Sequence, residues 1–234
     1  MDNRGMSHQQ KGMGGRHRVD ADINARLRAY FGERLERYGH DPRGVDWQSR
    51  DAQRARFEAL LSGLTGGDGH EEPVGENSLT GATLLDAGCG LGDFYAFLDE
   101  RGAAVHYTGC DLSEAHVEAA RRAYPTARFI AGDVRTVVAE ESFDVIVACG
   151  LLHLDVPRWG RWAWDVVRAM YRNCHRSLAF TLPERGAGRA PVIAAVSLGD
   201  WTARLRTLSP SVEARRLPEW GDIVFVLRKP LPPG

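Results

Sequence analysis

One glycine-rich stretch constrains the fold of this chain more than any other part. Residues 83–85 form a short apolar and β-branched run, and Gly88, Gly90 and Gly92 follow it in a G-x-G-x-G pattern. Glycine lets the backbone bend sharply and approach a ligand closely. The residues after Gly92 have helical character, and the free N–H groups at the start of a helix point back toward such a ligand. The stretch therefore predicts a strand–turn–helix unit with a ligand at its turn.

Asp86 indicates which class of ligand this turn holds. It lies two residues before the first glycine and adds a fixed negative charge, which repels a phosphate and holds an ammonium group. Dinucleotide-binding folds instead use G-x-G-x-x-G with no acid beside the pyrophosphate. One alternative stays open, in which the turn only packs the helix against the strand.

Two further carboxylates follow predicted strands. Asp111 ends the second strand within the run Gly109–Ser113, where a carboxylate can accept both hydroxyls of a ribose. Asp133 ends the third strand in Ala131–Val134. A helix cap at Asp111 and a simple strand-end turn at Asp133 are the alternatives.

A buried strand, residues 143–149, runs into a loop that contains Gly150 and His153. Ligands of open α/β sheets bind at this edge. Because a histidine titrates near neutral pH, His153 is a candidate general base. It is equally consistent with a histidine that only packs the loop.

These four stretches together resemble the motifs of the class I S-adenosylmethionine-dependent methyltransferases of the bacterial small-molecule type. The resemblance implies that Asp133 bonds the adenine amino group and that the N–H of Val134 meets the ring. It also implies that Cys149 and Gly150 line the methionine part of the cofactor and that His153 faces the substrate. The expected cofactor-binding residues are Trp47, Arg56, Asp86, Gly88, Cys89, Gly90, Gly92, Asp111, Leu112, Asp133, Val134, Cys149 and Gly150.

Further candidate site residues lie outside these four motifs. The segment 39–57 resembles one found before the first motif in many such enzymes, which implies that Trp47 and Arg56 reach over the cofactor, with the guanidinium on its carboxylate. A helical lid with a solvated arginine is the alternative.

Trp159 and Trp162 are candidates for the wall of an acceptor pocket, although their helical spacing suits core packing equally well.

Strand-like and helical stretches alternate from Gly81 onward, which predicts an α/β fold with a doubly wound, mostly parallel sheet. The last two strand-like runs flank a turn at residues 218–221 and predict a hairpin. The resemblance implies seven strands with an antiparallel last strand and an N-terminal helical extension. We expect a disordered leader over residues 1–20, a helical lid over 21–66, a linker over 67–80 and an S-adenosylmethionine-binding domain over 81–230.

Composition excludes several function classes. The chain has 234 residues, of which 43% are hydrophobic, and a net charge of −1, so we expect no nucleic-acid partner. Its four cysteines form no C-x-x-C pair, and we expect no metal. No long apolar run is present, so we expect a cytoplasmic protein without a membrane contact, as a monomer or homodimer.

The sequence thus predicts methyl transfer from S-adenosyl-L-methionine to a hydroxyl or nitrogen of a small molecule, with secondary metabolism as the expected context. A nicotinamide-dependent oxidoreductase and a non-catalytic S-adenosylmethionine-binding regulatory module are the alternatives. The identity of the acceptor, the methylated atom and the need for a base stay open.

Overall fold

The computed structural model describes residues 8–66, 79–186 and 192–230, with side chains from residue 20 onward. One seven-stranded sheet has the order β3-β2-β1-β4-β5-β7-β6. Its strands are β1 Thr83–Ala87, β2 His106–Asp111, β3 Arg128–Ala131, β4 Phe143–Ala148, β5 Cys174–Pro183, β6 Ser211–Leu217 and β7 Asp222–Arg228. The strands β1 to β5 pair in parallel, whereas β7 is antiparallel to both β5 and β6. The predicted sheet and its closing hairpin are confirmed.

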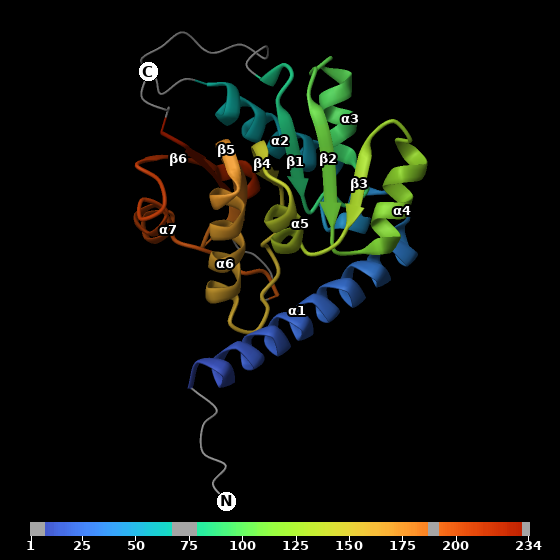
Figure 1. The fold of residues 1–234 in the computed structure, drawn as a ribbon. Helices are drawn as coiled ribbons and strands as arrows, with labels where there is room; N and C mark the ends of the chain where they lie inside the picture. Colours follow the sequence, from blue (N-terminus) through green and yellow to red (C-terminus); the bar gives the residue numbers. More distant parts are fainter. Residues whose placement is uncertain (1–7, 67–78, 187–191, 231–234) are drawn as a thin grey trace, which may run out of the picture.

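Helices connect the strands and cover both faces of the sheet (Figure 1). They are α1 His8–Tyr38, α2 Arg50–Thr65, α3 Asp93–Glu100, α4 Glu114–Ala123, α5 Val134–Glu140, α6 Trp159–Arg172 and α7 Leu198–Leu205, with short 3-10 turns η1 Pro42–Val45 and η3 Pro218–Trp220. Serine side chains cap three of these helices: Ser49, Ser113 and Ser197 each accept a backbone N–H of the first turn.

The core consists of two apolar clusters, one on each face of the sheet. Consecutive residues of a strand point to opposite faces, and accordingly Leu84 belongs to one cluster and Leu85 to the other. Buried residues of α2, α3 and α4 pack with Leu84, and those of α1, α5, α6 and α7 pack with Leu85. Both faces of β1 and β4 are therefore buried, as expected for the centre of a parallel sheet.

The helix α1 lies across the end of the sheet toward which the arrowheads of β1, β2 and β3 point (Figure 1). Ile23 and Leu27 are its buried core residues. The helix begins at His8, so the expected disordered leader is helical from that residue, while residues 1–7 lie outside the described part. Helical hydrogen bonds are local and no proline interrupts this segment, so the helix continues beyond its apolar pattern.

Other element boundaries differ modestly from prediction. The fifth strand extends beyond the predicted residues 177–182 at both ends, because His175 and Arg176 are exposed and give no apolar signal. They nevertheless lie in the strand that pairs with β4 and β7. Most of the predicted linker, residues 67–78, lies outside the described residues.

Candidate functional site

The turn after β1 has the predicted tight geometry. Gly88, Gly90 and Gly92 all have positive φ, at 78°, 51° and 84°. A Cβ on Gly90 would lie 2.8 Å from the Val45 side chain, so this position requires glycine for space as well as for conformation. The backbone N–H of Gly90 donates to Asp111 at 2.9 Å. The turn is thereby tied to the end of β2.

A first cavity of about 100 Å³ lies at this turn. It is lined by most of the predicted cofactor residues, namely Trp47, Asp86, Gly88, Cys89, Gly90, Asp111, Leu112, Asp133, Val134, Cys149 and Gly150. Gly92 does not line it and instead starts α3 as its N-cap. Helices α1 and α2 add Leu27, Phe31 and Phe57, which sequence reasoning did not assign to the site.

Asp86 is a buried carboxylate whose negative charge lacks a counterion. Its residue is 2% exposed, and it accepts a hydrogen bond from the Tyr107 hydroxyl at 2.8 Å. Burial raises the pKa of Asp86 to about 7; the carboxylates of Asp111 and Asp93 add to the rise, and the Tyr107 hydrogen bond opposes it. Among the described residues no basic group forms an ion pair with it. This carboxylate is suited to a cationic ligand group.

Asp111 lies at the end of β2 and accepts backbone N–H groups with both oxygens, from Gly90 at 2.9 Å and from Ser113 at 2.8 Å. Burial raises its pKa, although these N–H groups and His116 oppose the rise. Each carboxylate oxygen retains a second lone pair for a ligand hydroxyl. The Nε2 atom of His116, which also lines the cavity, is buried without a hydrogen-bond partner. No sequence motif includes this histidine.

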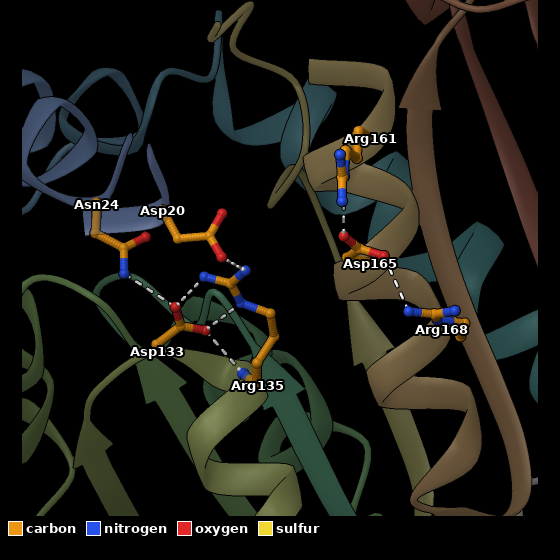
Figure 2. Close-up of polar contacts among 7 residues, drawn as sticks. All are labelled: Asp20, Asn24, Asp133, Arg135, Arg161, Asp165 and Arg168. Carbon is orange, nitrogen blue, oxygen red and sulfur yellow. Dashed lines mark hydrogen bonds and ion pairs between the residues drawn. The ribbon is translucent and has the colours of Figure 1, made fainter. Parts of the chain in front are cut away.

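Asp133 lines the same cavity, but protein groups already occupy both of its oxygens (Figure 2). Asn24 of α1 donates to Oδ2 at 2.9 Å, and the Arg135 guanidinium lies 2.6 Å from the same atom. Burial alone would raise the pKa of Asp133, but the hydrogen bonds from Arg135 and Asn24 hold it below its usual value. Arg135 also pairs with Asp20 at 2.8 Å. An adenine contact of Asp133 stays a prediction, and it requires that one of the four hydrogen bonds that this carboxylate accepts opens.

Arg56 lines the second cavity and not the first, and its contact with a cofactor carboxylate stays a prediction. Its buried guanidinium pairs with Asp222 at the start of β7 and donates to the backbone oxygen of Trp220 at 3.1 Å. It lies over the Trp47 ring, 4.6 Å from the centroid. The positive charge is therefore neutralised within the protein rather than offered to a cofactor carboxylate. Asp222 is 166 residues away in the chain, so local sequence gave no sign of this pair.

A second cavity of about 410 Å³ adjoins the first. Val45, Trp47, Gly150 and His153 line both cavities. Trp47 packs so closely on Gly150 that a Cβ there would lie 2.8 Å from the indole ring. The far wall comes from η3 and the start of β7, which the sequence suggested only as a hairpin turn; it contains Pro218, Glu219, Trp220, Gly221 and Asp222.

His153 lines both cavities, and both of its ring nitrogens are engaged. Nδ1 bonds the backbone oxygen of Gly150, and Nε2 lies 2.9 Å from Asp46. Asp46 also accepts from Tyr30 at 3.0 Å and pairs with Arg34 at 2.9 Å, both on α1. The role of His153 as a base stays a prediction, which requires that one of these contacts opens.

Only one of the two candidate tryptophans, Trp162, lies at a cavity. Trp162 is buried and lines the first cavity, and its Nε1 atom has no hydrogen-bond partner. Trp159 lines neither cavity: its Nε1 donates to the backbone oxygen of Leu152 at 2.9 Å, and its ring lies 5.7 Å from that of Trp201. The packing alternative holds for Trp159. Its indole prefers the apolar cluster because the one polar atom finds a partner there.

Within the described residues, no group of three or more histidine, cysteine or acidic side chains is arranged to hold a metal ion. None of the described helices is long and apolar enough to cross a membrane.

Comparison with known protein families finds a model that covers part of the chain. Residues 84–179 match the model described as "Methyltransferase domain". Over 65 residues the chain is 40% identical to trans-aconitate 2-methyltransferase of Escherichia coli O6:K15:H31 and 46% identical to that of Enterobacter sp. strain 638. The matched segment covers 28% of this chain and 26% of each relative.

Solved structures share the fold over much more of the chain. Magnesium protoporphyrin IX methyltransferase from Synechocystis PCC 6803 with bound SAH has a TM-score of 0.65 at 15% identity, covering 90% of this chain and all of that chain. The 1,6-didemethyltoxoflavin-N1-methyltransferase of Burkholderia thailandensis has a TM-score of 0.60 at 19% identity, covering 98% and 93%. Residues 84–179 are thus similar to the methyltransferase domain family, and the chain shares the fold of these solved methyltransferases.

Proposed function

We propose that the chain binds S-adenosyl-L-methionine in the first cavity and transfers its methyl group to a nitrogen or oxygen of a small molecule in the second. The observation that carries this proposal is Asp86. A carboxylate buried beside the glycine turn without a counterion fits the ammonium group of the cofactor's methionine part and repels a pyrophosphate. It thus favours S-adenosylmethionine over a nicotinamide dinucleotide.

The other residues of the first cavity fit the same ligand. Asp111 offers free lone pairs to the ribose hydroxyls, and the buried, unpartnered Nε2 of His116 is available to a polar group of the ligand. Gly150, with its φ of 76°, lets the backbone pass close to the ligand at the boundary between the cavities. We assign these residues to holding the cofactor in one orientation.

When bound, S-adenosylmethionine supplies an electrophilic methyl group on a sulfonium ion. The chain's own contribution is to hold the nucleophile in line with that group and to exclude water. Such positioning supplies about 7–11 kcal/mol of a reaction barrier. The adjoining second cavity supports an enzyme rather than a purely regulatory binding module, since a cavity of about 410 Å³ leaves space for an acceptor.

The relatives and structural neighbours support a small acceptor. They are named for trans-aconitate, magnesium protoporphyrin IX and 1,6-didemethyltoxoflavin. A role in secondary metabolism is our further expectation, and it draws on a composition in which every basic residue except Lys11 and Lys229 is arginine.

Calorimetry with S-adenosylmethionine, S-adenosylhomocysteine and NAD tests the proposal. We expect binding of the first two and not of NAD. Asp86→Asn keeps the side-chain volume but removes the charge, and it should weaken S-adenosylmethionine by about 3–5 kcal/mol, the cost of removing one partner of a buried ion pair. Asp99→Asn, an exposed position of α3, is the control and should bind as the wild type does. Binding of NAD in preference, or unchanged affinity in Asp86→Asn, would contradict the proposal.

A further inference from the structure

Three carboxylates that line the first cavity belong to neighbouring strands. Asp86 lies in β1, Asp111 ends β2 and Asp133 follows β3, and these strands are adjacent in the sheet. Neighbouring strands are about 5 Å apart. A ligand that places its ammonium group at Asp86 and its ribose at Asp111 therefore brings its base to Asp133. Any protein donor that already bonds Asp133 competes with that base.

Four hydrogen bonds reach the carboxylate of Asp133 (Figure 2). Arg135 donates three of them, from its backbone N–H at 2.9 Å, from Nε at 3.1 Å and from Nη2 at 2.6 Å. Asn24 of α1 donates the fourth from Nδ2, at 2.9 Å. A carboxylate has about four lone-pair positions. A ligand donor must consequently replace one of these bonds.

The bond from Asn24 is the one that opens at least cost. Asp133 is the N-cap of α5, so the backbone N–H of Arg135 is held on it by the helix itself. The guanidinium of Arg135 is charged, makes two of the bonds and is held in turn by Asp20 at 2.8 Å. Charged donors form hydrogen bonds about twice as strong as neutral ones. The amide of Asn24 is neutral, makes one bond and belongs to a half-buried side chain.

The same amide has the donor chemistry of adenine. Each has a planar NH2 group beside an acceptor atom, which is the amide oxygen in asparagine and a ring nitrogen in adenine. Because a carboxylate only accepts, the NH2 group of Asn24 must be the part that faces Asp133. Asn24 also lines the first cavity. It therefore occupies the hydrogen-bonding position that an adenine amino group needs.

The helix α1 need not move for this bond to open. Ile23, beside Asn24, is 1% exposed in the core. One turn further along, Arg28 donates to the backbone oxygen of Leu112 at 3.1 Å. These contacts fix the backbone on both sides of Asn24, so a change of its side-chain rotamer is sufficient.

We propose, resting on the function proposed above, that Asn24 is an intramolecular competitor of the cofactor: its amide bonds Asp133 in the ligand-free chain and swings away when the adenine amino group takes its place. The exchange replaces one N–H···O bond with another, so the carboxylate keeps all its partners in both states. Asn24 thereby stabilises the ligand-free chain and weakens cofactor binding.

Calorimetry with S-adenosylhomocysteine on the full chain tests this competition. Asn24→Ala removes the competing donor and should bind about two- to tenfold more tightly, the effect of one hydrogen bond. Asp22→Ala is the matched control, since it lies at an exposed position of α1 and gains about as much helix propensity. It should bind as the wild type does. Unchanged or weaker binding by Asn24→Ala, relative to this control, would overturn the proposal.

A second ligand separates competition from a mere gain of space in the cavity. S-inosylhomocysteine carries an oxygen where adenine has its amino group, so it cannot donate to Asp133. Asn24→Ala should improve its binding by less than twofold, and an equal gain for both ligands would overturn the proposal. Failure of the wild type to bind S-adenosylhomocysteine would instead refute the proposed function, on which this inference rests.

Thermal unfolding of the ligand-free chain provides a readout without any ligand. Asn24→Ala should melt at a lower temperature than Asp22→Ala, because it loses the bond to Asp133. The difference should disappear when S-adenosylhomocysteine saturates both variants. Equal melting temperatures of the two ligand-free variants would mean that the Asn24 bond contributes nothing, and the proposal would fail.

Discussion

At the scale of single residues, Asp86 shows how a ligand site opposes the stability of the free protein. Its carboxylate is buried among Asp93, Asp111 and the Tyr107 hydroxyl, with no cation beside it in the described part of the chain. A charge without a partner destabilises a folded protein. Asp86 therefore destabilises the ligand-free protein, whereas it stabilises a complex with a cationic ligand.

This carboxylate should make the stability of the free protein depend on pH. Its pKa rises from 3.8 in an unfolded chain to about 7 in the fold, so the native state holds its proton over a range where the unfolded state has lost it. The free energy of unfolding should therefore fall as the pH rises through that window. Asp86→Asn removes this dependence, and its stability advantage over the wild type should be larger at about pH 8 than at about pH 5 in urea unfolding. A difference that does not change with pH would show that Asp86 is already ionised without cost.

At the scale of elements, α1 is both a core helix and a wall of the first cavity. Ile23 is 1% exposed in the same cluster as the sheet, whereas Asn24, the next residue, bonds Asp133 beside the cavity. Adjacent residues of one helix thus serve packing and the site. Mutations of α1 should therefore fall into two classes: those that remove core packing and those that change the first cavity.

Ile23→Ala should destabilise the chain by about 2–5 kcal/mol, since a buried aliphatic side chain is removed and a cavity remains. Thermal or urea unfolding measures the change. Arg26→Ala, an exposed position of the same helix, should have little effect and serves as the control. Equal stability of Ile23→Ala and the wild type would mean that α1 is not part of the core.

Elements whose signals are local were predictable from the sequence. The glycine turn, the strand-end acids Asp86 and Asp111 and the final hairpin all follow from patterns of a few residues. The pairs Asp46–His153 and Arg56–Asp222 were not predictable, because each joins residues more than a hundred positions apart. The polar partners of a residue depend on tertiary packing, which the pattern around that residue does not encode.

At the scale of the whole molecule, the buried pair Arg56–Asp222 joins the N-terminal helices to the last strand. Its side chains are 3% and 5% exposed. Arg56→Met should destabilise the chain by about 3–5 kcal/mol, because it leaves the Asp222 carboxylate buried without its guanidinium. The double variant Arg56→Met/Asp222→Asn should recover part of that loss in urea unfolding.

Arg54→Met is the matched control, on the same helix but with an exposed side chain paired to Glu100, and should change stability little. If Arg56→Met were as stable as this control but bound S-adenosylmethionine more weakly, the resemblance would be right about Arg56 and the structural assignment wrong.

Trp47 forms a wall that the two cavities share, with its ring against Gly150 on one side and Arg56 on another. Any ligand that moves this indole changes the affinity for the other ligand, and thermodynamic linkage makes the effect equal in both directions. Changes of Trp47 made to alter acceptor choice will therefore also alter cofactor affinity. The turn Pro218–Trp220 lines the second cavity alone, so directed evolution of acceptor choice should begin there.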